Sequence, residues 1–547
     1  MSSRLARSAG LISIATMASR LLGVAREMVL ARVFGASADA SMDAFNVAFR
    51  VPNLVRDLFA EGAMTAAFVP TFSRTLNQDG REAAWRLGNL VINALLIVTT
   101  VLVVLGIVFA DPITRLLAAT DFTPPILRLL GFDVAPSAAA GFAKFEGKLE
   151  LTVQLTQIMM PFLTTIAVAV AMMGMLNSMN RFFVPALSPA MFNVATIACA
   201  FALVPYMPRF GLEPIVGIAI AAVLGGLGQI AVQWPSLRRE GFRYRPALDF
   251  ADSGLREILR LMGPGTLGLA AVQINVVVNT SLAATQEQGA VSWLQYAFRL
   301  MYLPIGLFGV SIATAALPDL SRQASDTDKS AMRTTLSSAL RMMLMLNVPA
   351  TVGLVVLAHP IVELILEHGR FMPTDTTATA QALMFYAPGL LGYSAVKIAS
   401  PSFYALRDSR TPVIISIASV MLNLALNLVL VGVMGYRGLA LGTAIAAVFN
   451  ALALLALLGR RIGGLEGARI ATALLKIMIA SAVMGAAALL MSRWLEAAVP
   501  GEQWYMRMMQ VFGAIAAGVI VLMGSAKLLR IAELDAAMSR VVRRIAR

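Results

Sequence analysis

The chain has 547 residues, of which 58% are hydrophobic and 14% charged, and its formal net charge is +14. Soluble globular proteins carry about 25% charged residues, so this composition excludes a soluble enzyme, a disordered chain and a disulfide scaffold. It predicts an all-α polytopic membrane protein, in which each spanning helix needs about 20 mainly apolar residues.

Cysteine and histidine are rare, which limits the chemistry of the chain. The sequence has one cysteine, Cys199, and two histidines, His359 and His368. We therefore expect no disulfide framework, no metal site and no cofactor. The basic excess of a membrane protein usually reports its topology, so we expect no nucleic acid among its partners.

Hydropathy predicts 14 spanning helices. The first is expected to be a retained helix because it contains Arg20 and Arg26 and lacks a clear cleavage site. The second carries Pro52, Asp57 and Glu61, and such interruptions are tolerated where they face protein or water. The predicted spans are 8–34, 43–72, 88–118, 151–177, 183–206, 213–235, 256–283, 290–320, 333–357, 376–399, 411–434, 437–458, 468–491 and 506–529.

Basic residues in the connecting segments predict the orientation. With the N-terminus in the cytoplasm, 26 Lys and Arg residues fall on the cytoplasmic side and 9 on the opposite side. Positive charge favours the cytoplasmic side, so both termini are predicted to be cytoplasmic, as an even number of spans requires. The longest outer segment, 112–150, is expected to be a partly ordered surface insertion.

The chain also repeats itself. Leu58-Phe59 and Thr65-Ala66-Ala67 recur 249 residues later as Leu307-Phe308 and Thr314-Ala315-Ala316, and Gly217–Val223 recurs as Gly442–Val448. A six-helix unit repeated in parallel is typical of secondary transporters. We predict an N-terminal lobe over 1–240, a C-terminal lobe over 241–462, two additional helices over 463–530 and a basic cytoplasmic tail over 531–547.

Several charged residues fall inside apolar segments, where a charge normally faces a cavity or a partner. The main candidates for a solvated cationic cavity are Arg20, Arg26, Arg56 and Arg299, because the guanidinium group suits bidentate binding of phosphate. Simpler interpretations stay open. Arg50 could reach the interface from near a helix end, Asp57 and Glu61 could neutralise neighbouring arginines, and Asp43 could be an N-cap of the second helix.

A family resemblance rests on a long block near the N-terminus and on shorter motifs further along. The chain resembles the MurJ/MviN family of lipid II flippases, within the multidrug/oligosaccharidyl-lipid/polysaccharide exporter superfamily, over about residues 8–460. The matching residues are Ser19-Arg20…Gly23…Arg26, Phe34-Gly35, Asp43-Ala44-Phe45, Pro52-Asn53-Leu54, Phe59-Ala60-Glu61-Gly62, Ala67-Phe68-Val69-Pro70, Asn180-Arg181-Phe182, Met262-Gly263-Pro264, Ser292-Trp293, Arg299-Leu300, Phe403-Tyr404-Ala405 and Thr411-Pro412.

The resemblance implies two six-helix lobes around a cationic cavity and a groove for the polyprenyl tail on the last two helices. It assigns the cavity arginines to Arg20, Arg26, Arg56 and Arg299, and the aspartate of the second helix to Asp43. Glu61 and Arg50 are expected to support or gate this cavity. Some members of the family have acidic residues where this chain has Phe298 and Tyr302, which puts a mechanism based on those acids in doubt.

The function implied is transport of lipid II across the bacterial cytoplasmic membrane by alternating access, for peptidoglycan synthesis and cell shape. Lipid II and membrane lipids are the expected partners, together with cell-wall synthesis or division proteins. A related exporter of other polyprenyl-linked saccharides or of drugs is the main alternative. A membrane-embedded enzyme is disfavoured because the acids lie beside arginines, and a scaffold is disfavoured because it would not use the internal charges.

Overall fold

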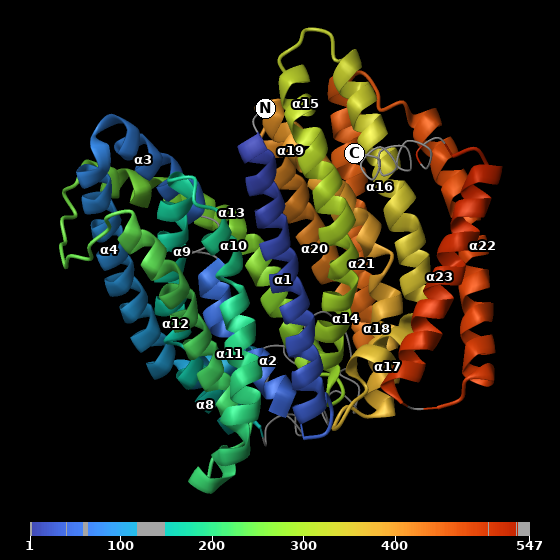
Figure 1. Ribbon diagram of the computed structural model, residues 1–547, viewed down its shortest axis with the longest axis horizontal. Coiled ribbons are helices and arrows are strands. Elements are labelled where there is room, and N and C mark those ends of the chain that lie inside the picture. The colour runs from blue at the N-terminus through green and yellow to red at the C-terminus, as the bar shows by residue number, and fades with distance from the viewer. Residues whose placement is uncertain are drawn as a thin grey trace. The chain divides into compact units, whose positions relative to one another are not determined.

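The computed structural model describes residues 3–39, 41–57, 64–117, 148–501, 503–531 and 533, and all regular structure within them is helical (Figure 1). In the first half the helices are α1 (Ser3–Phe34), α2 (Ser41–Arg56), α3 (Met64–Gln78), α4 (Gly80–Val108), α5 (Ala110–Leu117), α8 (Leu149–Met159), α9 (Phe162–Ser178), α10 (Phe183–Leu187), α11 (Ala190–Ala202), η2 (Val204–Phe210), α12 (Val216–Arg239) and α13 (Ser253–Ala284). In the second half they are α14 (Ala290–Pro304), η3 (Ile305–Gly309), α15 (Val310–Gln323), α16 (Ser330–Val356), α17 (Ala358–Leu366), α18 (Pro373–Tyr386), α19 (Gly389–Ala405), α20 (Arg410–Met434), α21 (Tyr436–Ile462), α22 (Gly467–Ala498) and α23 (Trp504–Leu528).

The prediction of a polytopic all-α protein is confirmed. Within the described residues, 10 helices are long and apolar enough to cross a membrane, and α18 with α19, bent by 44°, makes an eleventh. The other three predicted spans correspond to α1, to α2 with α3, and to α13. Each of the 14 predicted ranges thus overlaps a helix or a group of consecutive helices, although the count of 14 spans is not itself confirmed.

By internal contacts the chain divides into two compact units. The first is Met1–Ser292 with His368–Met372, and the second is Trp293–Glu367 with Pro373–Arg547. The lobe boundary at residue 240, which comes from the sequence repeat, stays a prediction.

The first unit has an aromatic core between α3, α4, α9 and α12. Phe68, Phe72 and Phe242 are each 1% exposed or less, and the indole of Trp85 contacts the rings of Phe72 and Phe242. Phe242 belongs to the basic segment that follows α12. That segment also packs on α4. The side-chain amides of Asn89 and Asn93, both on α4, donate hydrogen bonds to backbone carbonyls within residues 243–247.

The second unit relies on close helix contacts at small residues, as is usual in membranes. A Cβ at Gly392 of α19 would lie 2.4 Å from the backbone of Ala447 of α21, so these two helices touch at the backbone. The last two helices, α22 and α23, pack against each other and on α16 through Val348, Ile477 and Ala526. Trp494, Trp504 and Tyr505 are exposed where α22 and α23 are joined, as in the aromatic belts of membrane interfaces.

Helix breaks occur at related places in the two repeats. α2 contains Pro52 and ends at Arg56, and Asp57, the last described residue before residue 64, is π-helical. α14 ends at Pro304 and continues as the π-helix Ile305–Gly309 before α15 begins. Proline removes a backbone donor, and π-helical turns are frequent at functional sites. The predicted second span, 43–72, includes residues 58–63, which lie outside the described residues, so its interruption stays a prediction.

Candidate functional site

Arg26 lies on α1 between a carboxylate and an aromatic ring. Its guanidinium donates hydrogen bonds to Glu27, including one of 3.0 Å from Nε, and lies 5.2 Å from the ring centroid of Phe192. The side chains of Arg26 and Glu27 are 14% and 9% exposed. α1 is held beside α11 at this level, because the Asn193 amide donates to the backbone carbonyl of Ser19 at 3.2 Å. Arg26 is thus a positioned cation in a poorly solvated place.

Arg56 has an adjacent carboxylate as well. Its Nε and Nη2 atoms lie 3.1 and 2.8 Å from Oδ1 of Asp57. The second oxygen of Asp57 accepts hydrogen bonds from the side-chain amides of Asn53 and Gln273. Asp57 therefore neutralises Arg56, as one of the simpler interpretations predicted, and both side chains remain about a quarter exposed.

The other predicted residues differ in their surroundings. Arg20 is exposed on α1, and Arg50 is half-buried on α2. Arg299 is half-buried on α14, within the second unit. Glu61 lies outside the described residues. The three arginines of the first unit that were assigned to a cavity thus lie on two helices, and the structure places Arg26 and Arg56 each beside its own acidic neighbour.

Asp43 has a structural role that its position on α2 does not reveal. It is 2% exposed, and its carboxylate accepts hydrogen bonds from the backbone N–H groups of Gly289 and Ser292, at 2.8 and 2.9 Å, and from the hydroxyl of Ser292. These groups begin α14, whose first N–H groups have no partner within the helix. Asp43 is therefore a cap for α14, supplied from a distant helix.

Phe298, the residue before Arg299, belongs to an aromatic group. Phe298 stacks on Tyr302 with centroids 5.8 Å apart, and it makes edge contacts with Tyr386 at 5.5 Å and with Tyr393 at 6.0 Å. In the sequence, Phe298 and Tyr302 stand out only as replacements of acidic residues found in some members of the family. The signal that could have found this group is the presence of four aromatic residues close to Pro304 and to the bend between α18 and α19.

A second group that the sequence analysis missed joins α23 to α17. Arg507 is 12% exposed and its Nη2 atom lies 3.1 Å from a carboxylate oxygen of both Glu363 and Glu367. Burial raises the pKa of the Glu363 carboxyl, and the charge of Arg507 opposes this effect. The pair of glutamates fixes the beginning of α23 within the second unit.

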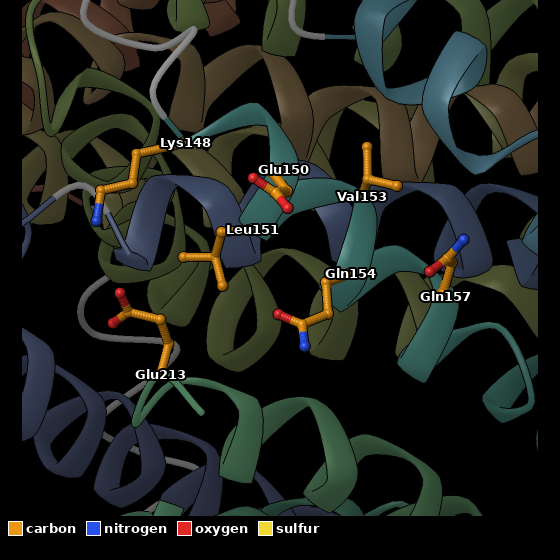
Figure 2. Close-up of a pocket in the computed structure, with 7 residues that line it drawn as sticks. All are labelled: Lys148, Glu150, Leu151, Val153, Gln154, Gln157 and Glu213. Atoms are coloured by element: carbon orange, nitrogen blue, oxygen red, sulfur yellow. The ribbon is translucent and has the colours of Figure 1, made fainter. Parts of the chain in front are cut away.

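The structure also has a polar pocket of about 510 Å³ beside α8 (Figure 2). Lys148 and Glu213 lie at one end, and Gln154 and Gln157 project from α8. None of the predicted cavity arginines lines this pocket, so it is separate from the charged residues described above.

These features define a polytopic α-helical membrane protein that carries arginines within its apolar helices. The fold is shared with known transporters. An inward-facing multidrug resistance transporter of the MATE family superposes with a TM-score of 0.62 at 17% identity, covering 82% of this chain and 96% of that chain.

Closer relatives identify the family. The family model described as lipid II flippase MurJ matches residues 30–506. The chain is 34% identical to a probable lipid II flippase MurJ of Vibrio cholerae, over 82% of each chain, and 34% identical to the lipid II flippase MurJ of Burkholderia cenocepacia, over 80% and 81%. A structure of lipid II flippase MurJ in an inward closed conformation superposes with a TM-score of 0.74 at 27% identity, covering 95% of this chain and 99% of that one. The chain belongs to the MurJ family of lipid II flippases.

Proposed function

We propose that this protein is a lipid II flippase, which moves the undecaprenyl-pyrophosphate-linked peptidoglycan precursor from the inner to the outer leaflet of the bacterial cytoplasmic membrane. The observation that carries the proposal is the family match over residues 30–506. The protein acts as a transporter and not as an enzyme, and both termini lie in the cytoplasm.

The pyrophosphate is the part of this substrate that arginine side chains would recognise. Charge-assisted hydrogen bonds from guanidinium to phosphate are short and roughly twice as strong as neutral ones. Arg26 and Arg56 have carboxylate partners in this structure, so a phosphate group would compete with Glu27 and Asp57 for the same donors. This exchange avoids an uncompensated buried cation when no substrate is bound. Arg20 and Arg299 complete the proposed set.

Asp43 would contribute by holding the first turn of α14, the helix that carries Arg299. Arg50 and Glu61 are proposed to support the site. The lobes are 1–240 and 241–462, and the helices over 463–530 hold the polyprenyl tail. Because the cell interior is negative, moving a negative charge outward is favourable by about 2.3 kcal/mol per charge per 100 mV, which would give the transport its direction.

The proposal is tested by expressing the chain in a Gram-negative host depleted of its own flippase and by measuring lipid II exposed on the outer leaflet. The wild type is expected to restore exposure, and a well-expressed Arg26→Ala variant is expected not to. Arg209→Ala is the matched control, because Arg209 is exposed in η2 and lies over the ring of Tyr206, away from the proposed site. Failure of the correctly inserted wild type would count against lipid II and in favour of another exported substrate.

A further inference from the structure

Two interrupted helices contribute to one aromatic group in the second unit. Phe298 and Tyr302 lie on α14 just before Pro304 and the π-helix η3. Tyr386 is the last residue of α18, and Tyr393 lies in the first turns of α19, beyond the 44° bend. Interrupted helices in transporters often form substrate sites, because irregular backbone is tolerated where it lines a cavity or lies within the protein.

The position of Tyr302 around α14 sets its environment. At 100° per residue, Tyr302 lies about 40° from Phe298 and about 60° from Arg299, between the two. A charged side chain within a spanning segment faces the protein or water and avoids the lipid tails. Tyr302 therefore lies on the side of α14 that also carries Arg299.

The ring of Tyr302 is held on one side and open on the other. It stacks on Phe298 with an interplanar angle of 30°, and Phe298 is itself fixed by the edge contacts with Tyr386 and Tyr393. Tyr302 is nevertheless 40% exposed, whereas Tyr386 is 8% exposed. The group therefore presents one ordered aromatic face, with a polar hydroxyl at its edge, one helical turn from a cation.

This combination suits a saccharide attached to a phosphate. The face of a pyranose ring is rich in C–H groups that pack on aromatic rings, while its hydroxyl groups point outward to polar partners. Residues three apart on a helix have Cβ atoms about 5–6 Å apart, so adjacent groups of one ligand can reach both side chains. We propose that Tyr302 stacks on the sugar ring next to the pyrophosphate, while Arg299 binds the phosphate. This inference rests on the proposed function and assigns a saccharide subsite to it.

The test compares the binding of two purified ligands, lipid II and undecaprenyl pyrophosphate, to full-length variants in detergent. Tyr302→Ala is expected to weaken lipid II binding about fivefold, the scale of one aromatic contact, and to leave undecaprenyl pyrophosphate binding unchanged. Tyr302→Phe should retain lipid II binding because the ring is preserved. Tyr206→Ala is the matched control, since Tyr206 is 49% exposed in η2, and this variant should bind both ligands as the wild type does.

The outcomes separate this inference from the proposed function. Equal weakening of both ligands by Tyr302→Ala would overturn the saccharide subsite, because the ring would then act through Arg299 or through the fold. Unchanged lipid II binding in Tyr302→Ala would overturn it as well. If the wild type binds undecaprenyl pyrophosphate and lipid II no better than a neutral lipid, the proposed function fails, whatever Tyr302 does.

Discussion

The two copies of the internal repeat differ most in their charge. Residues 41–67 contain five charged residues, Asp43, Arg50, Arg56, Asp57 and Glu61, whereas the corresponding residues 290–316 contain one, Arg299. In the first copy Asp57 neutralises Arg56, and Asp43 caps another helix. In the second copy the one charged residue, Arg299, follows Phe298, whose ring contacts those of Tyr302, Tyr386 and Tyr393. The same helix pattern thus carries five charged residues in one copy and one in the other.

Aromatic groups show the same contrast. Phe49 corresponds to Phe298 in the repeat, and it contacts Phe45, Phe162 and Phe192 in the first unit. That group consists of phenylalanines, and Arg26 lies over Phe192. The group around Phe298 contains three tyrosines, of which Tyr302 is the most exposed. The first group resembles a core, and the second has the polar edges of a binding surface.

The largest effect is expected at Arg299, the one charged residue of the second copy. Arg299→Ala should reduce transport by at least about tenfold, since a hydrogen bond to a charged group contributes about 1.5–3 kcal/mol. Arg50→Ala, at the corresponding position of the first copy, should have a smaller effect because Arg56 remains nearby in sequence. The transport activity of both variants is measured as lipid II exposed on the outer leaflet, at equal levels of the two proteins. An equal loss of transport in the two variants would contradict the view that the arginines of the two repeat copies differ in importance.

Asp43 should have the next largest effect, on stability. Asp43→Ala would leave the buried N–H groups of Gly289 and Ser292 without their acceptor, and each such group costs about 1–3 kcal/mol. We expect a lower thermal midpoint and faster hydrogen exchange at the beginning of α14. Ser292→Ala removes only the hydroxyl contacts with Asp43 and Asn46 and should cost about 1 kcal/mol. If the two variants are equally stable, Asp43 is not the cap of α14.

The two aromatic groups should respond differently to truncation. Phe49→Ala should lower the free energy of unfolding by about 3 kcal/mol, as expected for a ring packed in a core. Tyr302→Ala should change the thermal midpoint much less, because the ring is 40% exposed. Thermal unfolding of both variants in the same detergent measures the difference. A larger destabilisation by Tyr302→Ala would show that its group is also structural.

The smallest effect is expected at a local cap. The carboxylate of Asp408 accepts hydrogen bonds from the hydroxyl and backbone N–H of Thr411, which lower its pKa. The pKa of an aspartate in an unfolded chain is about 3.9. Because the pKa of Asp408 is lower in the folded protein, its carboxylate stabilises the fold at pH values above about 3.9, and this stabilisation is lost as the pH falls through the folded-state pKa. Asp408→Asn should therefore be slightly less stable at pH 7, and the difference should begin to shrink near pH 4 and disappear once the pH is below the lowered pKa of Asp408 in the folded protein. A difference independent of pH would exclude the charge as its cause.

Much of the fold could be predicted from the sequence because long apolar runs and prolines act locally. Each predicted span overlaps a described helix, and α2 contains Pro52 and ends at Arg56, just before Asp57. The pairs Arg26–Glu27 and Arg56–Asp57 join sequence neighbours, although only the second was anticipated.

The features that could not be predicted from the sequence depend on contacts between segments that are distant in the chain. Ser292 is 249 residues from Asp43, and hydropathy does not report which helix a buried carboxylate will cap. The repeat spacing of 249 does relate these two residues, and this was the one available signal. The aromatic group around Phe298 joins three helices, so its geometry follows from tertiary packing and not from any local pattern.

Transport by the purified protein tests the central claim most directly. The protein would be reconstituted into liposomes with labelled lipid II, and the lipid II that reaches the opposite leaflet would be measured under an imposed membrane potential. We predict that the wild type moves lipid II, that Arg26→Ala and Arg299→Ala do not, and that Arg209→Ala behaves as the wild type does. Full transport by folded Arg26→Ala and Arg299→Ala would contradict the arginine-based account.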